Sequence, residues 1–287
     1  MDMARAIAIF LFFGLAESAQ QPDAEQIVRR SIERDIFNSE RMRNYTFVQE
    51  IEEKHLDGDG NVKKTKTETS EIVMLYSEPH ERLIRRDGKP LPRAETRKQE
   101  EKLNRVIETR GKETEKQQAK RLTEAEKDRR KSREFLQKIP EAFILRLIGE
   151  ETLAGEETWN VEGTPNPAFH PYDRDTKRLT KLKGKLWISK ADYEWVKMEA
   201  ETIGNIFFGG VIARMNKGAV LKFEQTRVND EVWLPSHVHV SFDARLALVK
   251  SLRRAIDISF SDYRKFQSDS RIVFTSSTPE SHVAPAR

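Results

Sequence analysis

Carboxylates are abundant in this 287-residue chain, with 47 Asp and Glu residues, but the six histidines that could take part in acid–base or metal chemistry are scattered. His237 and His239 stand two positions apart, which places both on one face of a predicted strand. Two ligands alone do not make a zinc site, and no HExxH or similar motif supplies others. We therefore interpret both as polar residues on the outer face of a sheet. The chain has no cysteine, which excludes disulfides, zinc thiolates and a cysteine nucleophile.

Motifs of the common catalytic folds are also missing from the sequence. No serine lies in a G-x-S-x-G elbow. Neither phosphate-binding glycine pattern, G-x-x-x-x-G-K-[ST] or G-x-G-x-x-G, occurs. We predict that the protein is not an enzyme and uses no cofactor and no metal ion.

One segment matches a calcium loop in part. Asp57, Asp59, Asn61 and Glu68 stand at loop positions 1, 3, 5 and 12. Position 6, where the loop needs glycine, is Val62, and lysines follow it directly. The Asp-Gly-Asp-Gly composition instead predicts a hairpin turn between two strands.

Large aromatic residues gather in the segment KGKLWISKADYEWVKMEAE, residues 183–201. Trp187 and Trp195 are about equally far from a predicted turn, a spacing that allows them to be cross-strand neighbours. Such rings either stabilise a packed sheet or line a cavity that the covering helix leaves unfilled. The apolar run IFFGGVIA (206–213) fits a flexible lip of that cavity, or a buried strand with a bulge. The predicted ligand-contacting residues are Trp187, Trp195, Val196, Met198, Phe207, Phe208 and Trp233.

The N-terminus has the pattern of a secretory signal peptide. Arg5 is a weak basic region, the apolar run AIAIFLFFGL occupies 6–15, and small residues follow from Ala16 to Ala19. A bilayer span needs roughly 20 apolar residues, so this run is too short for an anchor by itself. The alternative is a buried N-terminal helix. We predict a signal peptide at 1–19 and a periplasmic or secreted protein without a lipid-modified cysteine.

Residues 93–138 differ in composition from the rest of the chain. These 46 residues include 16 basic and 10 acidic ones, whereas the net charge of the whole chain is only +4. The segment has no proline and a single glycine, Gly111. We predict one or two solvated helices with a break near Gly111. We interpret it as an exposed helical insertion, or as an arm that binds an envelope protein or an anionic membrane surface. Nucleic acid is not an expected partner, because interleaved aromatic residues are absent.

The rest of the chain alternates between apolar and polar residues. Residues 23–40 place Ile27, Val28 and Ile32 on one helical face. Strands are predicted at 44–55, 62–76, 158–163 and repeatedly from 183 onward, and a loop is predicted at 164–180. The pattern indicates an α+β fold with one large, strongly curved antiparallel sheet covered by helices. Residues 275–287 are rich in Ser, Thr, Pro and Ala and are predicted to be disordered.

Several stretches resemble the lipoprotein-sorting and carrier proteins of the bacterial periplasm. Gly149, Glu151 and Gly155 match that family's G-x-E-x-x-x-G element, which leads into a strand. Leu186–Ser189 and Trp195–Glu199 match its next two strands. The stretch VNDEVWLP resembles a later strand of the family, and the resemblance covers roughly residues 23–85 and 143–272.

This resemblance implies a half-open β-barrel closed by helices, with an apolar cavity of acyl-chain size and no enzymatic activity. We expect one such domain over residues 20–274, with the charged helical insertion at 93–138. The main hypothesis is an exported protein that binds lipid or the acyl chains of a lipoprotein in that cavity, for lipid or lipoprotein trafficking. The alternative is an envelope interaction module with a packed barrel that binds partners through 93–138.

Overall fold

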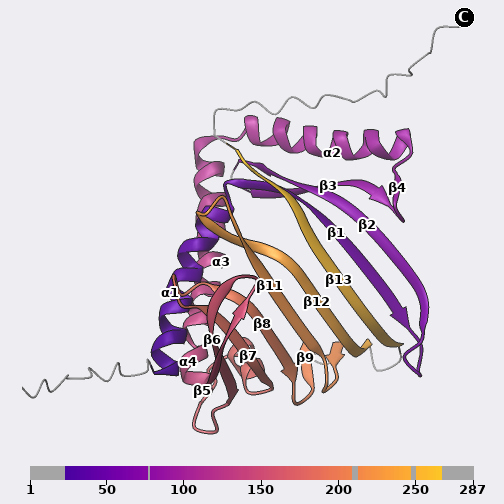
Figure 1. Cartoon of the computed structure of the whole chain (residues 1–287). Helices are drawn as coiled ribbons and strands as arrows, with labels where there is room; N and C mark the ends of the chain where they lie inside the picture. Colours follow the sequence, from indigo (N-terminus) through magenta and orange to yellow (C-terminus); the bar gives the residue numbers. More distant parts are fainter. Residues whose placement is uncertain (1–22, 77, 209–212, 247–249, 267–287) are drawn as a thin grey trace, which may run out of the picture.

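The computed structural model describes residues 23–76, 78–208, 213–246 and 250–266. The predicted signal peptide at 1–19 and the predicted disordered tail at 275–287 lie outside these residues. One large sheet dominates the described part of the chain (Figure 1). None of the helices described there is long and apolar enough to cross a bilayer.

Thirteen antiparallel strands form this sheet. Its main path runs in the order β4-β3-β2-β1-β13-β12-β11-β8-β7-β6-β5, and β10 pairs with both β12 and β9 beside that path. The strands are β1 (Tyr45–Leu56), β2 (Val62–Leu75), β3 (Glu78–Arg86), β4 (Lys89–Pro90), β5 (Phe143–Leu153), β6 (Glu156–Pro165), β7 (Leu182–Ser189), β8 (Trp195–Thr202), β9 (Ile206–Phe208), β10 (Ala213–Met215), β11 (Val220–Val228), β12 (Val232–Leu246) and β13 (Lys250–Lys265). Within the described residues β4 and β5 do not pair, so the sheet curves without closing. The predicted curved antiparallel sheet is confirmed.

Two of the connections follow the predicted hairpin chemistry. Asn229 and Asp230 both have φ of 53°, the left-handed conformation that a two-residue hairpin loop requires. In the turn between β1 and β2, Asp57 Oδ1 accepts hydrogen bonds from the backbone N–H groups of Asp59 and Asn61, each at 2.9 Å. Asp57 therefore caps a turn with its carboxylate.

One helix departs from the prediction. α5 (Arg174–Leu179) lies within the segment 164–180 that was expected to be a loop. Asp173 Oδ1 accepts a hydrogen bond from the Thr176 backbone N–H at 2.7 Å, and Thr176 Oγ1 accepts one from the Asp173 N–H at 3.2 Å. This reciprocal capping starts a helix that is too short to show an apolar period in the sequence.

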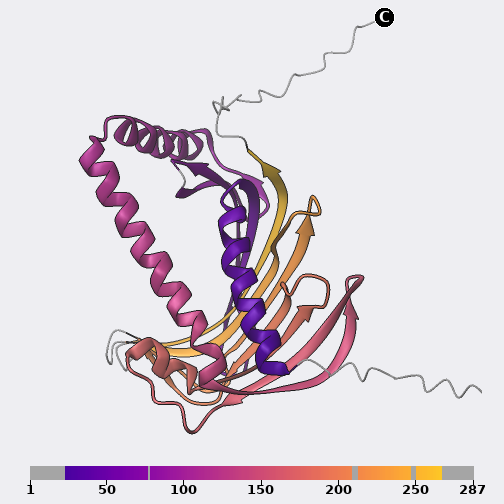
Figure 2. The same ribbon diagram turned by 90° about the vertical axis from the view of Figure 1, so that its left-hand side faces the viewer.

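The helix α1 (Ala24–Met42) lies in the curve of the sheet (Figure 2). Its predicted apolar stripe is buried, with Ile27 and Val28 fully covered and Ile32 2% exposed. The stripe forms the largest core cluster together with Trp159, Val161, Ile188 and Trp195 of β6, β7 and β8. α1 therefore covers the sheet mainly over β6, β7 and β8, at the end of the strand order nearest β5.

The charged segment folds into two helices, α2 (Arg93–Gly111) and α3 (Glu115–Gln137), followed by the short α4 (Ile139–Ala142). α2 ends at Gly111, where the break was predicted. It packs through the buried Leu103 against Val73 and Leu75 of β2. No residue of α3 is buried, and the helix runs apart from α1 over much of its length (Figure 2). That this segment is an insertion into a smaller domain stays a prediction.

Four charged residues hold the corner between α2 and α3 against the sheet. Arg110 lies 2.8 Å from Glu78 of β3 and 2.5 Å from Glu113. Arg121 of α3 lies 2.9 Å from Glu78 and 3.1 Å from Glu113. Burial acts to raise the pKa of Glu78, but the Arg121 and Arg110 guanidiniums outweigh it and hold that pKa below its ordinary value. The network therefore fastens the start of α3, which has almost no apolar contacts of its own.

Candidate functional site

A row of apolar side chains crosses the concave face of the sheet, on the same side as α1. Strand register places one residue of each of six neighbouring strands opposite the next, and alternation aims all six side chains to one face. The row consists of Leu186, Met198, Phe223, Val238, Ile258 and Ile51, in the order β7, β8, β11, β12, β13, β1. A second row beside it contains Ala200, Leu221, Val240 and Ile256.

The residues of these rows are less buried than the core residues under α1. Every side chain in the first row is half-buried, whereas Ile188, which faces α1 from β7, is fully buried. Leu186 and Met198 pack against the margin of the α1 core cluster, and the other four residues lie beyond that cluster. The concave face therefore carries an apolar surface that α1 fills at only one end. We take this surface as the candidate functional site.

A polar group borders the apolar rows on the same face. Glu53 is the cross-strand partner of Ile256, and it accepts a hydrogen bond from Arg254 Nε at 2.9 Å. His55 Nε2 lies 3.0 Å from the same Glu53 oxygen. Burial acts to raise the pKa of Glu53, yet His55 and Arg254 together hold that pKa below its ordinary value. The site thus changes from apolar to charged toward the end of β1.

The two tryptophans of the predicted hairpin lie on opposite faces. The cross-strand partner of Trp187 is Lys197, and that of Trp195 is Ile188. A shift in register at this point leaves Val196 without a direct partner and turns Trp195 toward α1. The prediction that Trp187 and Trp195 are cross-strand neighbours was therefore wrong. A bulge shifts the alternation by one residue, and a period-2 pattern does not reveal it.

The contacts of the two rings differ accordingly. Trp195 is 7% exposed, packs in the α1 cluster, and donates from Nε1 to Ser31 Oγ at 2.9 Å. Trp187 faces the outer side, where its Nε1 donates to Glu151 and the Lys197 ammonium lies 4.9 Å from its ring centroid. These contacts show both rings stabilising the sheet.

The other predicted ligand contacts are spread over the molecule. Met198 lies in the apolar row, and Val196 is buried at the bulge. Trp233 is 4% exposed and donates from Nε1 to Asp192 at 2.9 Å. Phe207 and Phe208 are exposed on β9. Of the seven predicted residues, the fold brings only Met198 to the concave apolar surface, and ligand contact stays a prediction for all seven.

The histidine pair does not form a metal site with its neighbours. His239 Nδ1 lies 2.8 Å and His237 Nε2 lies 3.4 Å from one oxygen of Asp257, on the face opposite the apolar rows. No group of three or more potential ligands able to hold a metal ion occurs in the described ranges.

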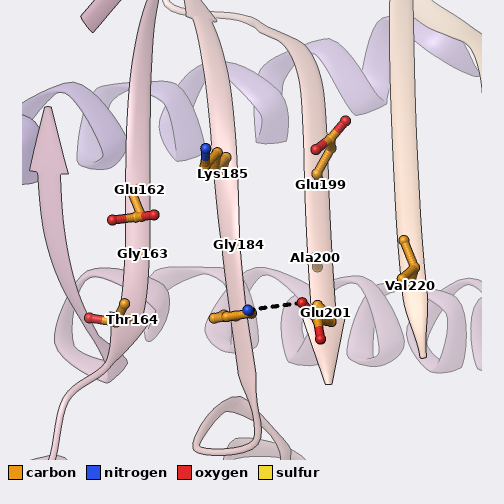
Figure 3. A pocket seen from close by; sticks show the side chains of 10 residues that line it. Glu162, Gly163, Thr164, Gly184, Lys185, Glu199, Ala200, Glu201 and Val220 are labelled. Carbon is orange, nitrogen blue, oxygen red and sulfur yellow. Dashed lines mark ion pairs between the residues drawn. The ribbon is translucent and has the colours of Figure 1, made fainter. Parts of the chain in front are cut away.

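Two hollows lie away from the concave rows. One, of about 230 Å³, lies on the outer face of β6, β7 and β8, where Glu162, Lys185 and Glu199 come from three adjacent strands (Figure 3). An ion pair of 2.9 Å between Lys183 and Glu201 crosses it. The other, of about 510 Å³, lies between α1, α3 and α4 and has a mixed charged rim. Neither combines an apolar lining with a set of converging polar groups, as a small-molecule site normally does.

A buried carboxyl group lies under α1. Glu194 is 3% exposed, and its nearest cation is Arg34, at 3.9 Å. Burial, with the nearby carboxylates of Asp192 and Asp35, raises the pKa of Glu194 to about 7, and burial raises that of Asp35 to about 6. The cluster faces α1 and not a cavity, so we assign it to the packing of that helix.

Comparisons with known proteins find likeness only at the level of structure. No protein-family model and no curated protein matches the chain. The putative outer membrane lipoprotein-sorting protein domain from Vibrio parahaemolyticus is 12% identical, with 85% of this chain and 95% of that chain covered and a TM-score of 0.29. A LolA superfamily protein from Nitrosomonas europaea is 11% identical over 86% and 95% of the two chains, with a TM-score of 0.28. MucB of Pseudomonas aeruginosa, solved with MucA, is 11% identical over 83% and 94%, with a TM-score of 0.25.

Proposed function

We propose that the protein is an exported, non-enzymatic carrier that binds an apolar ligand of the acyl-chain type on the concave face of its sheet. One observation supports this most directly. Six apolar side chains from six adjacent strands line up on that face and remain half-buried, although the sheet has a helix on the same side. A sheet whose only task was to pack against α1 would have no need of an apolar surface beyond that helix.

The dimensions of the row suit an extended chain. Neighbouring strands lie about 4.8 Å apart, so a row across six strands is roughly 24 Å long. Each methylene group that leaves water for this surface contributes about 0.8 kcal/mol. Binding would therefore depend on the length of the chain and little on its chemistry. Release would follow from transfer of the chain to a second site and needs no covalent step.

The first experiment identifies the ligand. The purified protein is extracted with organic solvent and the extract is examined by mass spectrometry, while a fluorescent fatty-acid probe is titrated into the delipidated protein. We expect co-purified acyl lipids and saturable probe binding that weakens as the probe chain is shortened. A clean extract together with no probe binding would leave only the envelope interaction module.

Paired variants locate the site. Ile258→Glu puts a charge into the apolar row, and Ser259→Glu puts the same charge at the adjacent, exposed position on the other face of β13. Ile258→Glu should weaken probe binding at least roughly tenfold, because a carboxylate disfavours an apolar partner. Ser259→Glu should bind like the unmodified protein. Equal binding by both variants would place the ligand elsewhere.

A further inference from the structure

β9 exposes two adjacent phenylalanines to solvent. Phe207 is 52% exposed and Phe208 is 37% exposed, whereas the preceding Ile206 is 6% exposed. Ile203, just before β9, is 36% exposed as well. Single exposed apolar residues are ordinary, but three large ones within six residues expose more apolar surface than is usual, as interaction surfaces do.

Two basic side chains of α5 and the residues after it lie beside these apolar residues. The Arg178 guanidinium of α5 lies 4.8 Å from the centroid of the Phe208 ring. The side chain of Lys181 lies so close to Gly204 that a methyl group there would be 3.0 Å from Lys181 Cδ. We call residues 178–181, 203–208 and 213–217 the β9 rim. Cationic heads on apolar stems beside exposed rings are the arrangement found where proteins meet a membrane interface.

Positive charge exceeds negative charge around the β9 rim. Residues 174–183 contain five basic residues and a single acidic one, Asp175, which pairs with Arg178 at 2.6 Å. Lys217 is also held next to the segment before β9, because its backbone N–H donates to Asn205 Oδ1 at 3.1 Å. Among the residues that the structure describes, neither Lys181 nor Lys217 forms an ion pair. Their charge is therefore available to a partner of opposite sign.

A second apolar and basic tip lies at the same end of the sheet. The turn between β1 and β2 lies at the lower end of the molecule in Figure 1, as β9 does, with β10, β12 and β13 between them. Val62, the first residue of β2 after this turn, is 53% exposed, and the lysines that follow it are exposed too. Strand register connects the tips, because β10 pairs with the end of β12, β12 with the start of β13, and the start of β13 with the end of β1.

We propose that this end of the sheet docks on an anionic lipid bilayer, with Phe207 and Phe208 entering the interface and the flanking cations facing the lipid headgroups. All charged residues of the β9 rim are basic. Two such rims would repel each other, so dimerisation through this surface is disfavoured, whereas binding to a membrane rich in anionic headgroups is favoured. Two exposed rings at a strand tip can enter the headgroup region without unfolding any core. This surface is separate from the concave rows, so the proposal does not depend on the carrier function.

The test is vesicle sedimentation with the full chain. Vesicles of phosphatidylcholine with an equal part of phosphatidylglycerol are compared with vesicles of phosphatidylcholine alone, at low and at high salt. We expect binding to the anionic vesicles, at least roughly tenfold weaker binding to the neutral ones, and weaker binding in high salt. Equal binding to both kinds of vesicle would overturn the role of anionic headgroups, and no binding to either would overturn the proposal and point to a protein partner.

Matched variants test whether the two phenylalanines of the β9 rim contribute more to vesicle binding than an exposed phenylalanine elsewhere on the surface. Phe207→Ser combined with Phe208→Ser should weaken vesicle binding about tenfold or more. Phe37→Ser is the control, since Phe37 is 47% exposed on α1 and also has an arginine, Arg41, 4.7 Å from its ring centroid. Equal loss of binding in the control, or full binding in the double variant, contradicts the proposal. Thermal unfolding of each variant shows that the fold is kept, and the fatty-acid probe shows that the concave face is unaffected.

Two double charge-reversal variants test the contribution of the basic residues in the same way. Lys181→Glu with Lys217→Glu reverses two charges on the rim, and each basic residue near an anionic surface changes affinity roughly fivefold. We expect at least tenfold weaker binding to the anionic vesicles. Lys98→Glu with Lys116→Glu makes the same change in net charge on α2 and α3. If vesicle binding depended only on the net charge of the protein, it would fall equally in the two double variants, and this result would exclude the β9 rim as the binding surface.

Discussion

Asn38 and Trp233 exchange two buried hydrogen bonds that fasten α1 to β12. Asn38 Nδ2 donates to the Trp233 carbonyl oxygen at 2.6 Å, and the Trp233 backbone N–H donates to Asn38 Oδ1 at 2.9 Å. The amide of Asn38 thus takes the place of a neighbouring strand at this point of the sheet. Because both residues are buried, water does not offer an easy replacement.

Asn38→Ala should therefore destabilise the protein by about 2–4 kcal/mol, since it removes two hydrogen bonds and leaves a buried N–H and C=O without partners. Urea denaturation followed by tryptophan fluorescence measures the change. Ser39→Ala is the neighbouring control, because Ser39 only bonds the Ile36 carbonyl on the exposed side of α1. A loss below about 0.5 kcal/mol in Asn38→Ala would show that water enters and restores the bonds.

Stability should fall as the pH rises from about 4 to about 7. The ordinary pKa values of Glu194 and Asp35 are 4.5 and 3.8, and burial raises them to about 7 and about 6 in the folded protein. The folded state therefore holds more protons than the unfolded state in this window, and deprotonation works against folding. Above pH 7 both states are ionised, and the cost of the buried charges is constant.

Glu194→Gln should remove most of that pH dependence. The ionised carboxylate meets Asp192 and Asp35 as well as the cations Arg34 and Arg227, whereas a neutral amide avoids the burial of charge. The variant should exceed the unmodified protein in stability by about 2 kcal/mol at pH 8 and match it near pH 4. Thermal unfolding across this range gives the result, with the exposed Glu33→Gln as control. An unchanged slope in Glu194→Gln would mean that other groups cause it.

Gly184→Ala should destabilise the sheet where β7 and β8 approach each other closely. A methyl group at Gly184 would lie 2.5 Å from the Glu199 carbonyl oxygen, so the backbone of one strand would have to move. We expect a loss of about 1–3 kcal/mol in thermal or urea unfolding. Gly149→Ala in β5 is the matched substitution, since nothing lies within 4 Å of its added methyl group. Similar stability of both variants would contradict the close approach.

Arg121→Met should loosen the start of α3. Arg121 is 13% exposed and pairs with both Glu78 and Glu113, so its loss leaves two carboxylates sharing Arg110. We expect about 1–2 kcal/mol lower stability and faster hydrogen exchange in the first turns of α3. The comparison is Arg130→Met, whose ion pair of 3.7 Å with Glu134 is largely exposed and should contribute less than about 0.5 kcal/mol. Equal exchange in the two variants would refute the anchoring role.

Local patterns in the sequence were enough to predict several elements. The apolar stripe of α1, the break at Gly111 and the hairpin loop at Asn229-Asp230 all follow from residue types at fixed spacings. Such features depend on interactions within a few residues of each other. The helix α5 escaped prediction because a six-residue helix shows its capping residues but no period.

The sequence by itself determined an antiparallel sheet, a helix with one apolar face and the absence of cysteine chemistry, because these depend only on composition and alternation. The tertiary structure alone decided which apolar residues are buried and which line the concave face. Trp195 and Met198 lie on the same strand, yet a bulge and the position of α1 place one in the core and the other in the half-exposed row. Strand register brings together residues more than a hundred positions apart in the sequence, and α1 covers only part of the surface that they form. No local sequence pattern contains information on contacts between such distant residues.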